Sequence, residues 1–549
     1  MSEELDEPFL TEDFSTGGGG IDFLGLRFVN LRILGDRLVP QINNAVRDAG
    51  TFYLGAWIPW KFRQLCETQG QSFFTEENYR KFREKIEVAM SIAMRDEGSA
   101  GATYGLARNR VGNNQSKSFS GNFSFENASR KRTNTIFSAP LYGPSLKYLG
   151  LVRSTDSMAE DGTLLNIALS AEDPDTLAIV ESVDASLRNS SAYDDLASLR
   201  ETAFSTEEVD SLGSNGLSPS CYKAEKFSTA KSSFCKKLLP ADVESPGFAR
   251  TLTAVLMLRT LEQKNGIDLT QVRNAWYTGM FDDGSLFQPL GQRLESQREI
   301  WGVFMAKQYQ RYFIELFLWC LESAIKEGCS SIEEAVRHWE TRSDKTENAS
   351  DLSLRDFLDR HADRVSSGES SLRSTRWNSL VHAGSDCFEY HADPKCDEAP
   401  LLGLEMLAGW YWRMLERRRN NGNSAEFSLG GSDRMSINWF IDWVESRSSQ
   451  SIRKFLAQVF NELVFSQHIR IALSRFDGNT QRLRFAIGDD GLEQVGQASN
   501  FGGLDLPWMA DRLDSFSDLL GDLDVVTKED GKIFLGPRAI EVSQMVADT

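Results

Sequence analysis

The segment that most constrains the fold of this chain is its C-terminal end, from Leu506 onward. A helical pattern opens there and carries apolar residues three or four positions apart, at Met509, Leu513, Phe516, Leu519 and Leu520. Two short apolar runs, 523–526 and 533–535, then flank a polar turn with Asp530-Gly531 at its tip, which predicts a β-hairpin. Gly536-Pro537 ends the hairpin and starts a short helix. This order predicts a winged-helix-like module, a type of domain that binds DNA or other proteins.

The length and charge of the chain limit the remaining possibilities. With 549 residues, of which 41% are hydrophobic, the chain is long enough for two to four domains. Its formal charge is −19, from 79 acidic and 60 basic residues. Contact with phosphates needs dense positive charge, so this balance argues against a protein that coats nucleic acid over its whole surface. We expect any contact with nucleic acid to use one local face.

The sequence also indicates a compartment. No uncharged apolar run approaches the roughly 18 residues that a membrane helix needs. The first residues, 1–7, are acidic where a secretory signal would be basic and then apolar. Seven cysteines form no disulfide framework in a chain of this length. We therefore expect a cytoplasmic protein without a membrane segment.

Composition and periodicity predict a mainly α, multidomain fold with small β-hairpins. We expect a flexible acidic tail (1–20) and an aromatic-rich N-terminal domain (21–153) with a basic loop rich in Gly, Asn and Ser (98–135). A polar, acidic and weakly packed insertion follows (154–244), then a helical core domain (245–445) with a His/Cys loop (382–396). The last region (446–549) combines a helix with the winged-helix-like module.

Individual elements are also predicted. Helical stripes run over 76–94, 299–326, the residues after Pro400, and 452–476, and the residues 483–487 suit a strand. The stripe over 299–326 is so wide that we expect its helix to be buried on more than one side. Pro59 interrupts the aromatic block 52–62 and predicts a helix break, because proline removes a backbone hydrogen bond.

The basic loop 98–135 is the candidate nucleic-acid contact. Cations can neutralise phosphates, and aromatic rings can stack on bases. The candidate residues in the loop are Arg108, Arg110, Lys117, Phe119, Phe123, Arg130, Lys131 and Arg132. The spacing of its phenylalanines suits a short strand or hairpin. The alternative is a solvated loop whose charges have no specific partner.

Two further residues, Arg482 and Arg484, are candidates for phosphate contact beside the terminal module. The main helix of that module instead carries Asp511, Asp514, Asp518 and Asp522, with only Arg512 to offset them. An acidic helix would repel phosphates in a DNA groove. We therefore expect this helix to pack on its own protein or on a partner protein.

A possible structural zinc site lies in the His/Cys loop. Zinc prefers four nitrogen or sulfur ligands, which His382, Cys387, His391 and Cys396 would supply. The loop has no Cys-x-x-Cys pair, so the alternative is a loop with two buried thiols and two surface imidazoles.

Other charged residues have structural interpretations. Arg311 and Glu315 lie one helical turn apart, either as a surface ion pair or as a buried pair that fixes packing. Arg413, Arg417, Arg418 and Arg419 close a helix, where cations interact favourably with the helix dipole.

The chain has no phosphate-binding Gly-x-x-x-x-Gly-Lys loop, no His-Glu-x-x-His and no Gly-x-Ser-x-Gly. A nuclease site built from scattered Asp, Glu and Lys residues would leave no such motif, so an enzyme stays open as an alternative.

Several local patterns together resemble a known group of proteins. They include 40–44 with the aromatic run 52–62, the helix with 83–85, the residues 142–148, the stretch 301–315, and the ending 467–468, 483–485 and 490–491. Their order and spacing resemble a loose group of uncharacterised bacterial proteins that are often encoded in phage-defence loci beside helicases or nucleases. The acidic insertion and the His/Cys loop are not part of this resemblance. The resemblance implies a defence-system subunit and assigns no catalytic residue.

From these observations we expect a non-enzymatic subunit of a bacterial anti-phage defence or DNA-processing complex. It would act as a scaffold, contacting DNA through its basic loop and partners such as a helicase or a nuclease through its helical and winged-helix surfaces. The alternatives are a metal-dependent nuclease and a zinc-dependent transcriptional regulator.

Overall fold

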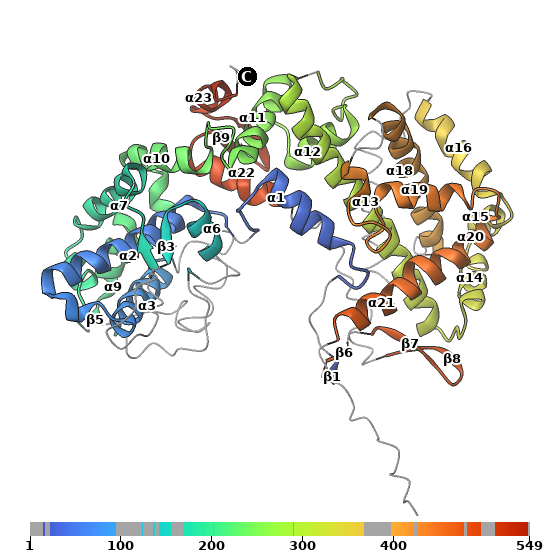
Figure 1. The fold of residues 1–549 in the computed structure, drawn as a ribbon, viewed down its shortest axis with the longest axis horizontal. Coiled ribbons are helices and arrows are strands. Elements are labelled where there is room, and N and C mark those ends of the chain that lie inside the picture. Colours follow the sequence, from blue (N-terminus) through green and yellow to red (C-terminus); the bar gives the residue numbers. More distant parts are fainter. Residues whose placement is uncertain are drawn as a thin grey trace, which may run out of the picture. The chain divides into compact units, whose positions relative to one another are not determined.

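Figure 1 shows the computed structural model of the chain, which describes residues 15–16, 22–44, 46–94, 123–124, 136–137, 142–154, 168–200, 203–288, 290–366, 397–421, 425–476, 480–481, 483–495 and 511–546. The structure is 67% helical and 7% strand, and its strands form small two-stranded sheets. The predicted mainly α fold with small β elements is therefore confirmed. Among the described residues, no helix combines the length and the apolar character that a membrane crossing requires.

The described residues form two compact units, each assembled from several segments of the chain. The first unit takes the described residues within 1–35, 270–289 and 298–509. The second unit takes those within 36–269, 290–297 and 510–549. The C-terminal module thus belongs to the same unit as the aromatic N-terminal helices.

The first unit is mainly helical, and its described residues include two short strand pairs. Apart from the first residues of α12 and α13, which belong to the second unit, its elements are β1 (Ser15–Thr16), η1 (Val29–Leu34), α12 (Leu269–Thr278), α13 (Gln292–Lys326), α14 (Ile332–Glu340), α15 (Asp344–Ser350), α16 (Leu354–Ser366), α18 (Ala399–Asn421), η8 (Ala425–Ser428), α19 (Ile437–Glu445), α20 (Ile452–Gln458), η9 (Val459–Ser466), α21 (Gln467–Ser474), β6 (Thr480–Gln481), β7 (Phe485–Gly488) and β8 (Gly491–Gln494).

The second unit contains the remaining elements. They are α1 (Gly35–Leu38) after its first residue, α2 (Ala49–Gln69), η2 (Gln71–Phe73), α3 (Glu76–Ala93), β2 (Phe123–Ser124), α6 (Gly143–Tyr148), β3 (Val152–Ser154), β4 (Ala168–Ser170), α7 (Pro174–Leu187), α8 (Tyr193–Leu196), β5 (Ala203–Phe204), α9 (Thr206–Leu212), η4 (Gly213–Leu217), η5 (Pro219–Lys223), η6 (Glu225–Phe227), α10 (Ser228–Leu238), α11 (Phe248–Gln263), α22 (Leu513–Asp522), β9 (Val526–Glu529), β10 (Lys532–Leu535) and α23 (Ala539–Gln544).

The helix α13 is buried on all sides along most of its length. Every residue from Trp301 to Glu322 is buried, as the wide apolar stripe predicted. Neighbouring helices donate hydrogen bonds to its backbone: the Trp410 indole binds the Ala306 carbonyl at 2.8 Å. The helix is longer than the predicted 299–326, because it begins at Gln292.

The helix α2 runs without interruption from Ala49 to Gln69, so the predicted break at Pro59 is wrong. A proline in a helix interior costs about 3 kcal/mol through its missing hydrogen bond and its steric clash. Trp57, Ile58 and Phe62 are fully buried around it. Burial of each such side chain contributes about 1.5–3 kcal/mol, so packing outweighs the cost of the proline.

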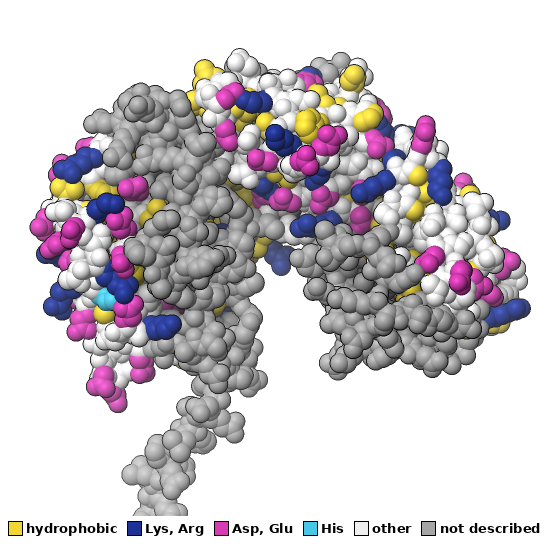
Figure 2. Space-filling model, turned by 180° about the vertical axis from the view of Figure 1, so that it is seen from behind, with side chains coloured by type: hydrophobic (Ala, Val, Ile, Leu, Met, Phe, Trp, Pro, Cys, Tyr) yellow, Lys and Arg dark blue, Asp and Glu magenta, His cyan; other side chains and the backbone are white. Residues whose placement is uncertain are grey.

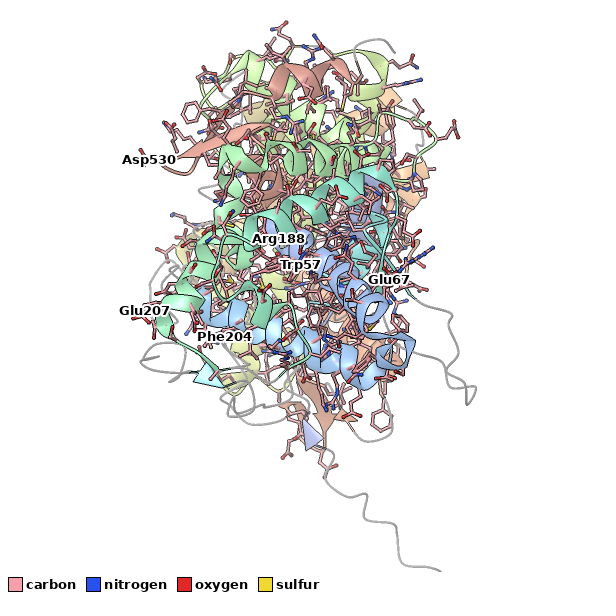
Figure 3. The ribbon with its side chains drawn as sticks, turned by 90° about the vertical axis from the view of Figure 1, so that its left-hand side faces the viewer. Trp57, Glu67, Arg188, Phe204, Glu207 and Asp530 are labelled. Atoms are coloured by element: carbon pink, nitrogen blue, oxygen red, sulfur yellow. The ribbon has the colours of Figure 1, made fainter. Side chains whose placement is uncertain are left out.

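The stretch predicted to be a weakly packed insertion instead contains a well-buried helix, α7. Half of its residues are apolar, and Ile179, Val180 and Val183 are fully buried. Its Asp184 accepts a buried hydrogen bond from the indole of Trp57, which is labelled in Figure 3, at 3.1 Å. The prediction failed because a polar average composition hid a regular apolar stripe.

The C-terminal module has the predicted order of helix, hairpin and short helix. Strands β9 and β10 pair antiparallel, with Glu529 opposite Lys532. The two turn residues, Asp530 and Gly531, both have positive φ, at 50° and 75°. These angles are typical of the type I′ turn that an Asp-Gly pair favours. Asp530 marks the projecting tip of the hairpin in Figure 3.

The other predicted elements are found with small shifts. The helix over 76–94 is α3, and the helix after Pro400 is α18, which begins one residue earlier. The helix predicted over 452–476 is α20, η9 and α21 in succession, with a π-helical middle. The strand predicted at 483–487 is β7, which forms a hairpin with β8.

Candidate functional site

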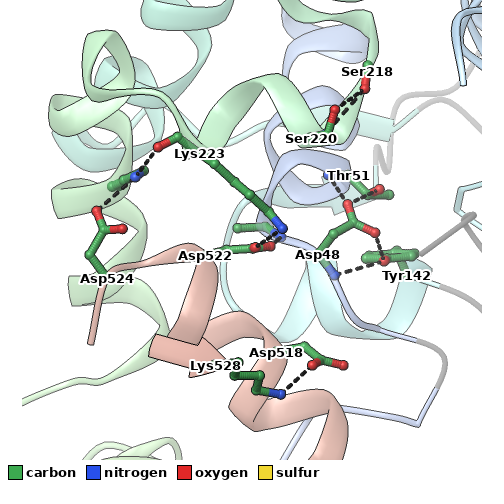
Figure 4. A network of polar contacts seen from close by, with 12 residues as sticks. Asp48, Thr51, Tyr142, Ser218, Ser220, Lys223, Asp518, Asp522, Asp524 and Lys528 are labelled. Carbon is green, nitrogen blue, oxygen red and sulfur yellow. Dashed lines mark hydrogen bonds and ion pairs between the residues drawn. The ribbon is translucent and has the colours of Figure 1, made fainter. Parts of the chain in front are cut away.

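The second unit contains a polar cavity of about 490 Å³ at the start of α2. Residues from η5, from the end of α22 and from β9 also line it. Its charged lining residues are Arg47, Asp48, Lys223, Asp518, Asp522, Asp524 and Lys528, several of which Figure 4 shows. We call it the Asp522 cavity. It brings together acidic residues that lie far apart in the sequence.

The local sequence explains how α22 brings Asp522 to this place. Leu513, Phe516, Leu519 and Leu520 lie on one face of α22 and are fully buried. This packing holds the end of α22, and with it Asp522, against the start of α2. The Asp522 carboxylate accepts a hydrogen bond from the backbone N–H of Ala49 at 2.9 Å. The C-terminal helix therefore supplies a hydrogen-bond acceptor to an otherwise unpaired donor of α2.

Asp48 is the N-cap residue of α2 and the second carboxylate of the cavity. It accepts hydrogen bonds from the Thr51 backbone N–H at 2.8 Å, from the Thr51 hydroxyl and from the Tyr142 hydroxyl at 2.8 Å. Burial raises the pKa of Asp48 above its ordinary value, although these hydrogen bonds oppose the rise. The N-cap position is the one part of this site for which the sequence held a signal, an Asp immediately before a helical pattern.

Burial also raises the pKa of Asp522, to about 6. The negative charges of Asp48 and Asp518 add to the rise, whereas the Ala49 hydrogen bond and the Lys223 ammonium oppose it. The Lys223 Nζ lies 3.6 Å from the Asp522 carboxylate. A carboxylate that titrates close to neutral pH can act as a general acid or base, in addition to its role at the helix terminus.

Most other charges of the cavity have partners. Lys528 pairs with Asp518, and Asp524 pairs with Lys231 at 2.8 Å. Arg47 differs, because its buried Nε has no hydrogen-bond partner among the described residues. The cavity thus presents both signs of charge to a ligand.

The structure places few of the residues predicted to contact nucleic acid. Arg108, Arg110, Lys117, Phe119, Arg130, Lys131, Arg132 and Arg482 lie outside the described residues. Phe123 is in the two-residue strand β2, opposite Phe204 of β5. This pairing agrees with the short strand that the phenylalanine spacing predicted.

The prediction that Arg484 contacts phosphate is wrong. Its side chain is buried and pairs with Glu322 through Nε and, at 2.9 Å, through Nη2. Its guanidinium also lies over the Phe23 ring, 4.5 Å from the ring centroid. A cation that is buried and neutralised in this way is not accessible to a polyanion.

Arg311 and Glu315 form the buried pair that was one of the two alternatives. Their Nη1 and Oε2 atoms are 3.6 Å apart, and both side chains are almost fully buried. Arg27 approaches the same carboxylate at 3.5 Å. Two cations therefore share one carboxylate, and burial lowers the pKa of Arg311 below its ordinary value.

Three of the four arginines near the end of α18, namely Arg413, Arg417 and Arg418, have partners on other elements of the first unit. Arg413 and Arg417 donate to the Tyr277 carbonyl at 2.7 and 3.1 Å. Arg418 pairs with Asp442 at 2.6 Å and with Glu445 at 3.3 Å.

The candidate zinc ligands His382, Cys387, His391 and Cys396 lie outside the described residues. Within the described ranges, no group of three or more His, Cys, Asp or Glu side chains is arranged to hold a metal ion.

Sequence patterns gave no signal for two buried polar residues of the first unit. Lys307 donates to the Met435 and Arg434 carbonyls at 2.7 and 3.0 Å, and His468 is fully buried. Both follow the apolar periodicity of their helices, so only the folded structure reveals their partners.

Comparisons with protein-family models, with curated proteins and with solved structures found no significant match to this chain.

Proposed function

We propose that the protein is a non-enzymatic subunit of a bacterial anti-phage defence or DNA-processing complex in the cytoplasm. In this proposal it is a scaffold that contacts DNA through the basic loop 98–135. Its helical surfaces and its C-terminal module contact partner proteins, such as a helicase or a nuclease. The resemblance of several sequence patterns to proteins of phage-defence loci supports the cellular setting.

The observation that carries this proposal is that several arginines among the described residues already have partners within the protein. Arg484 is neutralised by Glu322, while Arg413 and Arg417 bind the Tyr277 carbonyl. On the face seen in Figure 2, the exposed Lys and Arg side chains of the described residues are interspersed with Asp and Glu. Since a polyanion needs concentrated positive charge, the dense cations of loop 98–135 are the best candidates for binding it.

The pairing of β2 with β5 supports a defined position for part of this loop. Phe123 lies opposite Phe204, and Ser124 lies opposite Ala203. A loop joined in this way to the second unit can present its cations from a folded body instead of from a free tail.

We further propose that the C-terminal module is a winged helix that binds protein. Its order of α22, hairpin and α23 suits that type of domain, with the hairpin as the wing. Its acidic residues face its own chain in part: Asp522 binds the Ala49 N–H, and Asp518 pairs with Lys528. An acidic helix with these contacts is better suited to protein than to DNA.

The proposal is tested by reversing three charges of the loop, in the variant Arg130→Glu/Lys131→Glu/Arg132→Glu. We expect the affinity for a DNA duplex to fall and the salt dependence of binding to weaken, because each lost phosphate contact removes about one released counterion. Fluorescence anisotropy at several salt concentrations measures both quantities.

A matched control reverses three exposed cations elsewhere, Arg80→Glu/Lys345→Glu/Lys454→Glu. It makes the same change in net charge, so it should leave DNA affinity nearly unchanged. Equal losses in both variants, or wild-type binding that does not respond to salt, would contradict the proposal. Co-purification of the products of neighbouring genes tests the scaffold role.

The Asp522 cavity favours a second candidate function, a metal-dependent nuclease. Asp522, with its pKa near 6, can accept a proton from water near neutral pH, and the nearby Lys223 ammonium can stabilise negative charge. Mg²⁺ in such enzymes is often held by one or two carboxylates together with substrate phosphates, and Asp48 would be the carboxylate ligand in this cavity.

This second candidate predicts cleavage of DNA or RNA by the pure protein with Mg²⁺ or Mn²⁺. The variant Asp522→Asn keeps an acceptor for the Ala49 N–H and should abolish cleavage without unfolding the protein. The exposed residue Asp359 gives the control Asp359→Asn, which should be fully active. No cleavage by the wild-type protein with either ion would leave the scaffold as the better description.

A further inference from the structure

A second cavity of the second unit, of about 520 Å³, lies along α10. Asp524 and the start of α23 complete its wall. We call it the α10 cavity. It is distinct from the Asp522 cavity in its lining, apart from Asp524, which lines both.

Four hydroxyl groups of α10 line this cavity. Ser228, Thr229, Ser232 and Ser233 occupy positions i, i+1, i+4 and i+5, which lie on one face of a helix. The apolar residues Phe234 and Leu238 are fully buried. The helix thus separates an apolar face from a face of hydroxyl groups that lines a cavity.

Ser233 is the most informative of these residues. It is only 6% exposed, yet its hydroxyl makes no hydrogen bond with any described residue. Its oxygen is not one of the fully buried polar atoms that lack a partner, so the hydroxyl can be reached from the cavity and has no partner within the described residues. Since Ser233 lines the cavity, a molecule in the cavity can supply that partner. In addition, no side chain caps the N-terminus of α10, where the helix dipole favours an anion.

The charges of the α10 cavity also favour an anion. Three cations line it, Lys231, Lys236 and Arg538, against two carboxylates, Asp524 and Glu541. This excess of positive charge contrasts with the formal charge of −19 for the whole chain.

Two of these cations, Lys231 and Arg538, keep N–H hydrogens that can donate to a ligand. The buried Lys231 ammonium donates to the Lys223 carbonyl and to Asp524, both at 2.8 Å, which leaves one of its three hydrogens. Arg538 uses Nε and Nη2 for Glu541, both at 2.9 Å, and retains its Nη1 hydrogens.

We propose that the α10 cavity binds a phosphate group, the anion that best matches several hydroxyl, ammonium and guanidinium donors at once. A phosphate has more acceptor positions than a carboxylate, so it can engage Ser233, Lys231 and Arg538 together. The phosphate can belong to a small phosphorylated molecule or to the 5′ end of a nucleic acid. This site is separate from loop 98–135.

The test measures binding of inorganic phosphate to the full chain by calorimetry in phosphate-free buffer. Ser233→Ala should weaken binding about tenfold, the effect of one lost hydrogen bond to a charged group. The same variant should keep or raise the melting temperature without phosphate, because the hydroxyl has no protein partner to lose.

Two exposed lysines provide a matched pair of charge reversals, Lys236→Glu in the cavity and Lys226→Glu outside it. We expect Lys236→Glu to abolish phosphate binding and Lys226→Glu to leave it almost unchanged. The inference is overturned by a wild-type protein that does not bind millimolar phosphate. Equal affinity of the wild-type, Ser233→Ala and Lys236→Glu proteins would also overturn it.

A comparison of oligonucleotides identifies the source of the phosphate. If a 5′-phosphorylated strand binds more tightly than its 5′-hydroxyl equivalent and competes with inorganic phosphate, the ligand is a nucleic-acid end. If phosphate binds without this preference, the ligand is a small molecule. Failure here is distinguishable from failure of the proposed scaffold function, because charge reversal at Arg130, Lys131 and Arg132 leaves the α10 cavity intact.

Discussion

His468 should make the stability of the first unit depend on pH. The residue is fully buried, and its Nε2 accepts the backbone N–H of Arg484 at 2.9 Å. Its Nδ1 faces the Phe23 carbonyl oxygen at 3.3 Å, so the hydrogen of the neutral ring belongs on Nδ1. A second proton would have to displace the Arg484 hydrogen bond. Burial, together with the Arg484 charge, lowers the pKa of His468 to about 4.

The sign and size of the effect follow from this pKa. The ordinary value is 6.5, so the folded state takes up a proton less readily than the unfolded state. The contribution of the neutral His468 to the free energy of unfolding is complete above pH 6.5 and is lost as the pH falls toward 4. A shift of about 2.5 units at about 1.4 kcal/mol per unit gives a full loss of about 3 kcal/mol. About 2 kcal/mol of it should appear between pH 7.5 and pH 5.

Urea unfolding of the wild-type protein and of His468→Gln at several pH values measures this effect. The variant should be less stable at pH 7.5 but should lose much less stability on acidification. His338→Gln, at a partly exposed histidine, is the control and should keep most of the wild-type pH dependence. Equal slopes for wild type and His468→Gln, or an NMR titration of His468 near pH 6.5, would refute the reasoning.

Three further predictions concern buried or candidate ligand residues. Lys307→Met removes the donor to the Met435 carbonyl, and we expect a loss of about 2–4 kcal/mol in urea unfolding. Because burial lowers the pKa of Lys307 to about 7, from 10.5, its contribution to stability rises with pH over that range, and the variant should lack this rise. Glu322→Gln leaves Arg484 buried without its carboxylate, which should cost about 3–5 kcal/mol by thermal unfolding, whereas the exposed Glu327→Gln should change stability by less than about 0.5 kcal/mol. If the His/Cys loop holds zinc, elemental analysis should find one zinc ion per wild-type chain and none in His391→Ala.

Periodicity predicted the helices well because each helix buries a continuous stripe. The stripes of α3, α13 and α18 gave their positions to within a few residues, except for the N-terminal extension of α13. The Asp530-Gly531 turn was predictable for a local reason, since both residues tolerate positive φ. The effect of a single residue on its own backbone was a poor guide at Pro59. The helix continues through this proline because the neighbouring side chains are buried.

The candidate sites were much less predictable than the helices. Asp48 had a helix-cap signal, but nothing in the sequence connected it with Asp522, which reaches the start of α2 only through the packing of α22. The α10 cavity was equally hidden, because Ser233 and Arg538 belong to distant segments. Such sites depend on contacts between segments that no local pattern records.

Some basic residues are equally hard to interpret from the sequence, because their partners are backbone groups. Several buried or partly buried cations bind carbonyl oxygens at helix ends: Lys85 binds that of Asp195 in α8, Arg250 binds that of Leu238 in α10, and Arg413 binds that of Tyr277 in α12.

The last carbonyls of a helix have no partner within it and carry partial negative charge, so they can hold a buried cation without a carboxylate. A cation used in this way resembles a solvated lysine or arginine in the sequence, because its partner is backbone. Counts of Lys and Arg therefore overestimate the positive charge that a phosphate can contact in this protein. A nucleic-acid site should therefore be assigned here by experiment, and the charge reversals above separate two candidates, loop 98–135 and the α10 cavity.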